Sequence, residues 1–207
     1  MEVAALLLNG IRGNNVNQLV KKMLAVRQMF PPSLNINKFI VGSVYEELLV
    51  RAFKECSFAC ENVASTSSKV DIHVTVDSVV YPYSIKSMAT LNTNVILENY
   101  RGNKKPLTDC APTFLIVLDN PIYILYFDHA ILTEHADSSM PLYIQNDSSL
   151  MLNKKQVKQM IPKLDEKYKI VLERPFIEQY PVCKIEDILT DFIEKMTGNI
   201  TNDIHID

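Results

Sequence analysis

Asp71, Ser84 and Lys86 are polar residues within two stretches of alternating hydrophobicity. Across residues 70–76 the aliphatic side chains fall on even-numbered positions, so Asp71 belongs to the opposite, polar face of the expected strand. In the second stretch, Ser84 and Lys86 share one face in the same way. If the chain reverses at residues 77–78, Asp71 stands directly opposite Ser84, and directly opposed residues point to the same side of a sheet. We therefore expect Asp71 and Lys86 to converge on one face of a hairpin.

A carboxylate and an ammonium group on one face are suited to the hydrolysis of phosphodiester bonds. A carboxylate can hold Mg²⁺, an ion that takes oxygen ligands and usually keeps several waters. The ion polarises a phosphoryl oxygen and lowers the pKa of bound water. A lysine beside it orients or deprotonates the attacking water and neutralises charge on the phosphate. Asp71 is therefore a candidate metal ligand, and Lys86 is a candidate catalytic residue.

The combination of Asp71, a turn and the run Ser84-Ile85-Lys86 resembles the PD-(D/E)xK signature of the restriction-endonuclease-like nucleases. The resemblance extends over about residues 42–94. It implies a restriction-endonuclease-like fold, Mg²⁺ as the cofactor and double-stranded DNA as the substrate. It also implies that the Ile85 carbonyl completes the metal shell, and that Ser84 lies within the catalytic site.

The sequence departs from this signature in two places. Lys69-Val70 stand where the family has a proline, and Ser84 stands where it has a second acid, so one metal ligand is missing. The resemblance implies a substitute from the helix expected over residues 36–56. Winding that helix at about 100° per residue places Glu46 at the border of the core and Glu47 on the solvent face. A buried carboxylate is costly unless it is paired or metal-bound. Glu46 is therefore the candidate ligand, and an ion pair between Glu46 and a nearby Lys or Arg is the alternative.

The hydrophobic pattern predicts helices before and after a run of strands, which is typical of an α/β domain with a mixed central β-sheet flanked by helices. Helices are expected at residues 15–30, 36–56, 154–161 and 185–196. Strands are expected at residues 69–76, 79–88, 113–118, 122–127, 141–145 and 169–172. Residues 92–100 are expected to form a short helix or loop, and residues 101–112 a polar connection. We expect one nuclease domain over residues 1–207, with an N-terminal helical part (1–35), a catalytic core (36–130) and a C-terminal elaboration (131–207).

Polar residues that follow the expected strand at 79–88 are candidates for contacts with DNA. Asparagine can read adenine edges in the major groove, and lysine and arginine contact phosphates. The candidates are Asn92, Asn94, Arg101, Lys104 and Lys105. The formal net charge of −3 counts against a nucleic-acid-binding protein.

The histidines are weaker candidates for a metal site. His73 shares the face of Asp71, where an ordinary hydrogen bond is the favoured interpretation. His129 and His135 follow a strand with a spacing that fits no helical metal motif, so both are expected to be loop residues.

These features predict a site-specific, Mg²⁺-dependent type II restriction endonuclease. A homodimer is expected, because a twofold pair most simply cuts both strands of a symmetric site. The alternatives are a repair nuclease or junction resolvase with the same fold, and a non-catalytic binding or structural protein in which Asp71, Ser84 and Lys86 form an ordinary polar pair. No apolar run approaches the roughly 20 residues that span a bilayer. The four cysteines form no CxxC pair, so a cytoplasmic location is expected.

Overall fold

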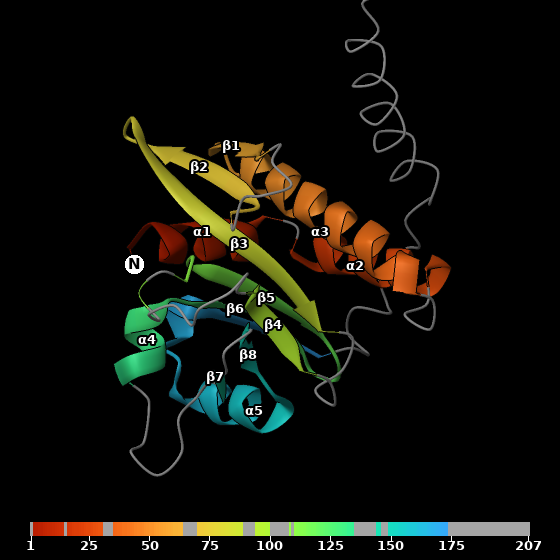
Figure 1. The fold of residues 1–207 in the computed structure, drawn as a ribbon. Helices are drawn as coiled ribbons and strands as arrows, with labels where there is room; N and C mark the ends of the chain where they lie inside the picture. The colour runs from red at the N-terminus through yellow and green to blue at the C-terminus, as the bar shows by residue number, and fades with distance from the viewer. Residues whose placement is uncertain are drawn as a thin grey trace, which may run out of the picture.

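The computed structural model describes residues 2–14, 16–30, 35–63, 70–88, 94–99, 108, 110–134, 144–145 and 149–173. Its larger sheet has six strands, in the order β1 (Ala59–Asn62), β2 (Ile72–Val76), β3 (Val79–Met88), β5 (Thr113–Leu118), β6 (Ile122–Phe127) and β9 (Lys169–Leu172) (Figure 1). β3 and β5 run parallel, whereas the other neighbouring strands of this sheet run antiparallel. A smaller sheet has three strands, in the order β4 (Val95–Asn99), β8 (Ser149–Leu152) and β7 (Ile144–Gln145).

Three helices, α1 (Glu2–Gly13), α2 (Val16–Met29) and α3 (Asn35–Glu55), precede the strands and pack against one another. Figure 1 draws them on one side of β5 and β6, and the smaller sheet with α5 (Lys154–Lys163) on the other. This arrangement confirms the predicted α/β fold with a mixed central sheet flanked by helices. None of the helices in the described part of the chain is long and apolar enough to cross a membrane.

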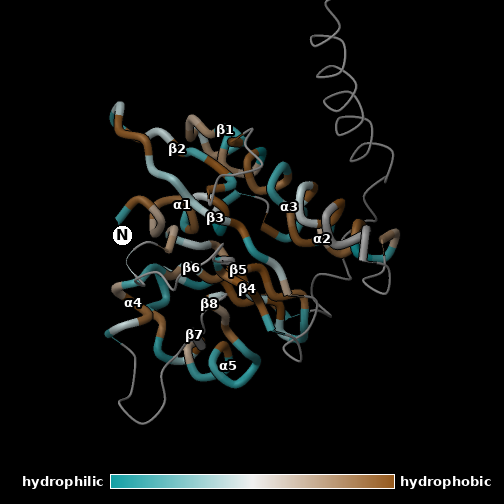
Figure 2. The backbone as a smooth tube through the Cα atoms, viewed as in Figure 1, coloured by the Kyte–Doolittle hydropathy of each residue, from teal (hydrophilic) through white to brown (hydrophobic). Residues whose placement is uncertain are grey.

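The core is centred on β5 and β6. Every residue of β5 is buried, and β6 is buried except at Tyr123. A strand covered on both faces has a continuous rather than an alternating hydrophobic sequence, and Figure 2 shows hydrophobic residues concentrated along these two strands. The ring of Phe114 in β5 lies 5.0 Å from that of Tyr83 and 5.5 Å from that of Tyr126, centroid to centroid. This aromatic cluster joins β3, β5 and β6.

The strongly patterned elements were predicted well. The strands at 79–88, 113–118, 122–127 and 169–172 have the expected bounds, and the helices at 15–30, 36–56 and 154–161 agree within two residues. The prediction of a helix or loop at 92–100 was wrong, because its described part forms β4. Val95 and Leu97 of β4 are buried while Ile96 is exposed, which is the period-two pattern of a strand. The helix expected at 185–196 lies outside the described residues.

Five elements were not predicted: α1, β1, β8, α4 (His129–Glu134) and the 3₁₀ turn η2 (Glu166–Tyr168). His129 begins α4, which corrects its assignment to a loop, while His135 lies outside the described residues. The Asp128 carboxylate caps this helix, because its Oδ1 accepts a hydrogen bond from the Ile131 amide at 2.9 Å. A six-residue helix is too short to display a reliable hydrophobic period in the sequence.

Candidate active site at the divergence of β2 and β3

The hairpin of β2 and β3 has the predicted register. Val76 pairs with Val79, and Ile72 pairs with Tyr83. Asp77 and Ser78 form the turn with positive φ angles of 50° and 64°, the conformation that favours tight reversal of two twisted strands.

β3 changes partner in the middle of its length. Its first half pairs with β2 as far as Tyr83, and from Ser84 onward it pairs with β5. The Asp71 amide donates to the Tyr83 carbonyl at 2.9 Å, and the Ser84 amide donates to the Pro112 carbonyl at 2.8 Å. Beyond this point one edge of β3 no longer pairs with the β2 backbone. The site is built at this divergence of the two strands.

The Asp71 carboxylate takes the place of the missing strand partner. Its Oδ2 atom accepts hydrogen bonds from Ser84 Oγ at 2.8 Å, from the Ile85 amide at 2.6 Å and from Lys86 Nζ at 3.1 Å. Its Oδ1 atom accepts no hydrogen bond from the described residues. The Asp71 and Lys86 side chains are 20% and 27% exposed, so the ion pair is only partly open to solvent. The expected convergence of Asp71, Ser84 and Lys86 is confirmed as geometry.

Glu46 lies on α3, which packs against β1 and β3. Its pKa is raised to about 7, first by burial and then by the negative charge of Asp71, while the positive charge of Lys86 lowers it. Glu46 is therefore within electrostatic reach of both residues of the ion pair. It makes no ion pair or hydrogen bond with the described residues, so the alternative of a salt bridge to a nearby Lys or Arg is not found there. The negative charge of Asp71 therefore acts on the Glu46 carboxylate.

Glu47 is not on the solvent face of α3, where the sequence had placed it. Glu47 lies one helical turn before Arg51 on α3 and accepts a hydrogen bond from Arg51 Nε at 3.1 Å. Glu47 does not face solvent, however, because its side chain is only 16% exposed and also accepts a hydrogen bond from Asn62 Nδ2 at 2.7 Å. Asn62 belongs to β1, a strand that the sequence pattern did not reveal. Glu47 therefore fastens α3 to the edge of the sheet.

The oxygen atoms at the divergence fit a hard divalent cation such as Mg²⁺. Asp71 Oδ1 and the Glu46 carboxylate are candidate anionic ligands of the kind that Mg²⁺ and Mn²⁺ prefer. Because the N–H and C=O of one strand residue leave the strand at the same edge, the Ile85 carbonyl shares the open edge with its amide. No group of three or more His, Cys, Asp or Glu side chains within the described ranges is arranged to hold a metal ion. The candidate donors are therefore two carboxylates and one carbonyl.

The other sequence candidates lie outside this cluster or outside the described residues. His73 stands between Glu61 and Pro82 in the strand register and makes no described contact with Asp71. Asn94 is exposed immediately before β4. The candidates Asn92, Arg101, Lys104 and Lys105 lie outside the described residues.

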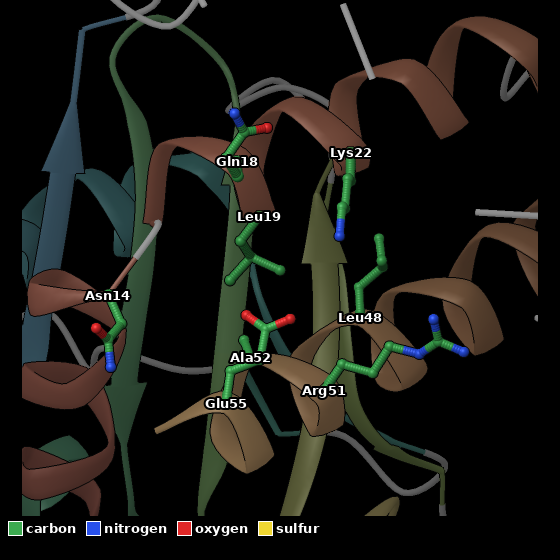
Figure 3. A pocket seen from close by; sticks show the side chains of 8 residues that line it. All are labelled: Asn14, Gln18, Leu19, Lys22, Leu48, Arg51, Ala52 and Glu55. Atoms are coloured by element: carbon green, nitrogen blue, oxygen red, sulfur yellow. The ribbon is translucent and has the colours of Figure 1, made fainter. Parts of the chain in front are cut away.

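A separate pocket of about 190 Å³ lies between α2 and α3 (Figure 3). Its walls include charged side chains of both signs, and its lining residues are Asn14, Gln18, Leu19, Lys22, Leu48, Arg51, Ala52 and Glu55. At about 100° per residue, Glu55 projects from the opposite side of α3 to Glu46. This pocket is therefore distinct from the candidate active site.

Comparisons with known proteins give one similar structure. No protein-family model matches the chain, and no curated protein matches it in sequence. A solved restriction endonuclease in complex with substrate DNA is similar over 75% of this chain and 80% of that chain, with 14% sequence identity and a TM-score of 0.43.

Proposed function

We propose that this protein is a Mg²⁺-dependent endonuclease that hydrolyses phosphodiester bonds of double-stranded DNA, and that it acts as a site-specific type II restriction enzyme. The observation that carries the proposal is the pairing of Lys86 Nζ with Asp71 Oδ2 at 3.1 Å, on an open strand edge. The raised pKa of Glu46, which the charge of Asp71 helps to cause, supports Glu46 as a second carboxylate of the proposed site.

Each residue has a distinct role in the proposed reaction. Asp71 Oδ1, the Glu46 carboxylate and the Ile85 carbonyl hold the cation, which when bound polarises the phosphate and lowers the pKa of a coordinated water. The Lys86 ammonium group orients that water and neutralises charge that develops on the phosphate oxygens.

Contacts with DNA are assigned to Asn94 and to the candidates outside the described residues, Asn92, Arg101, Lys104 and Lys105. Asn92 and Asn94 lie in the chain between β4 and the end of β3, the strand that carries Lys86. The three basic candidates follow β4. We also propose a homodimer, because one active site per chain most simply cleaves both strands of a symmetric sequence as a twofold pair.

The decisive experiment compares wild-type protein with Lys86→Ala on plasmid DNA in Mg²⁺. We expect Lys86→Ala to bind DNA but to lose at least about a hundredfold in cleavage rate, the scale of a removed acid-base or charge-stabilising group. Lys54→Ala is the matched control, because Lys54 is an exposed residue near the end of α3. Undiminished cleavage by Lys86→Ala would exclude the assigned role.

The choice of substrate separates the proposed enzyme from its alternatives. Cleavage of plain plasmid at fixed positions is expected of a restriction enzyme, whereas preference for branched or damaged DNA would indicate a resolvase or repair nuclease. Wild-type protein that cleaves none of these substrates in Mg²⁺ would leave Asp71 and Lys86 as a structural ion pair.

A further inference from the structure

The three donors that converge on Asp71 leave its two carboxylate oxygens in different situations. Oδ2 receives the Ser84 hydroxyl, the Ile85 amide and the Lys86 ammonium group. A carboxylate offers about four lone-pair positions over its two oxygens, so these contacts exhaust the capacity of Oδ2. The positive charge on Lys86 also opposes a cation at that atom. Only Oδ1 is available to a cation.

Ser84 is placed to maintain this difference. It is 2% exposed, so water cannot readily replace Asp71 as the partner of its hydroxyl group. Its amide is also fixed, because it donates to the Pro112 carbonyl at 2.8 Å where β3 joins β5. The Ser84 hydroxyl therefore approaches Asp71 from a rigid part of the sheet.

We propose that Ser84 is a positioning residue, which ties down Asp71 Oδ2 so that Asp71 presents Oδ1 alone to a single divalent cation shared with Glu46. Ser84 thus replaces the absent acid with a different function, because it orients the remaining aspartate rather than contributing a charge. The inference rests on the proposed function, since it takes the site to hold a divalent cation.

The test measures cation binding in the absence of DNA, by isothermal titration of the full chain with Mn²⁺. The variants are Ser84→Ala, which removes the hydroxyl, and Ser84→Thr, which keeps it. Ser87→Ala is the matched control, because Ser87 is an exposed serine on the same strand.

We expect wild-type protein to bind one Mn²⁺ per chain. Loss of a group that orients a metal ligand typically weakens metal affinity ten- to a hundredfold, so we expect a rise of about that size in the Kd of Ser84→Ala. Ser84→Thr and Ser87→Ala should bind like the wild type. Rescue by threonine distinguishes orientation by the hydroxyl from a general effect of altered packing.

Two results would overturn the proposal: equal Mn²⁺ affinity in Ser84→Ala and Ser87→Ala, or two Mn²⁺ ions per wild-type chain that are both lost in Asp71→Asn. A separate cleavage assay distinguishes this failure from failure of the proposed function. Single-ion binding that depends on Ser84 but occurs without DNA cleavage would support the positioning role and reject the nuclease. DNA cleavage by the wild type together with unchanged Mn²⁺ binding by Ser84→Ala would support the nuclease and reject the positioning role. Absence of both Mn²⁺ binding and DNA cleavage in the wild type would reject both.

Discussion

Replacing Glu46 with glutamine is expected to stabilise the metal-free protein at alkaline pH while it impairs the proposed cation site. The pKa of Glu46 is raised from 4.5 to about 7 in the folded protein. Between these values the unfolded chain releases the proton while the folded chain retains it, so stability falls as pH rises. The loss is absent below pH 4.5 and complete above about pH 7. Glutamine does not ionise, so Glu46→Gln should not show this pH-dependent loss of stability.

The pKa difference sets the size of this effect. At 1.36 kcal/mol per pKa unit, a rise from 4.5 to about 7 corresponds to at most about 3.4 kcal/mol. Glu46 is only partly buried, so screening by solvent reduces this to on the order of 1–2 kcal/mol. For a chain of this length, that difference should raise the melting temperature of Glu46→Gln by about 2–8 °C relative to the wild type at pH 8.

The assay is thermal unfolding in EDTA at pH values from 4 to 8. Glu55→Gln is the control, because Glu55 is exposed and helical winding at about 100° per residue places it on the opposite side of α3 from Glu46. The difference between Glu46→Gln and wild type should grow with pH, whereas Glu55→Gln should show no such trend. Addition of Mg²⁺ at pH 8 should raise the melting temperature of the wild type more than that of Glu46→Gln, because a bound ligand stabilises in proportion to its affinity. Parallel pH curves together with equal gains in Mg²⁺ would refute both the burial and the ligand role of Glu46.

Three further predictions concern the framework of the site and the assembly. Glu47→Gln should lower the free energy of unfolding by about 1–3 kcal/mol, because Glu47 accepts hydrogen bonds from Arg51 and Asn62. Denaturation in urea measures this difference, and an unchanged free energy of unfolding would contradict a structural role for Glu47. Ser78→Gly should stabilise the hairpin by about 1 kcal/mol, because Ser78 has a φ of 64°; a lowered melting temperature would contradict this reasoning. Light scattering with cognate duplex should give the mass of two chains, and a monomer that nicks one strand at a time would count against the dimer.

The sequence predicted the geometry of the β2–β3 hairpin because period-two alternation fixes which residues share a face. Asp71 and Ser84 could be placed opposite each other once the turn at Asp77 and Ser78 was located, and both follow from local pattern. The change of partner by β3 was not predictable in this way. It depends on the pairing of Ser84 with Thr113 in β5, which is distant in the chain.

Helical winding similarly predicted the direction in which each side chain leaves α3, but it could not predict which other elements pack against those side chains. It separated Glu46, at the border of the core, from Glu47 on another face of the helix. It could not show that β1 covers Glu47, because the four residues of β1 are too few for a clear strand pattern. The packing of β1 against α3 is also a tertiary contact that no local pattern indicates. The sequence placed Ser84 opposite Asp71, at the position of a missing acid within the catalytic site. The hydrogen bond that it donates to Asp71 became visible only with the side-chain positions.

The raised pKa of Glu46 bears on the choice between a cation site and an ordinary polar pair. Asp71 and Lys86, with Ser84 and the Ile85 amide, already form a charge-compensated cluster that satisfies the open edge of β3. Adding a second carboxylate to such a cluster destabilises the folded chain, and a glutamine in its place would avoid the charge. Groups that reduce stability without a structural return are typical of functional sites, where activity offsets their cost. A structural ion pair of Asp71 and Lys86 is not stabilised by the Glu46 carboxylate. A bound divalent cation would be, because the Glu46 carboxylate would then serve as one of its ligands. Glu46 therefore favours the catalytic interpretation over the non-catalytic one.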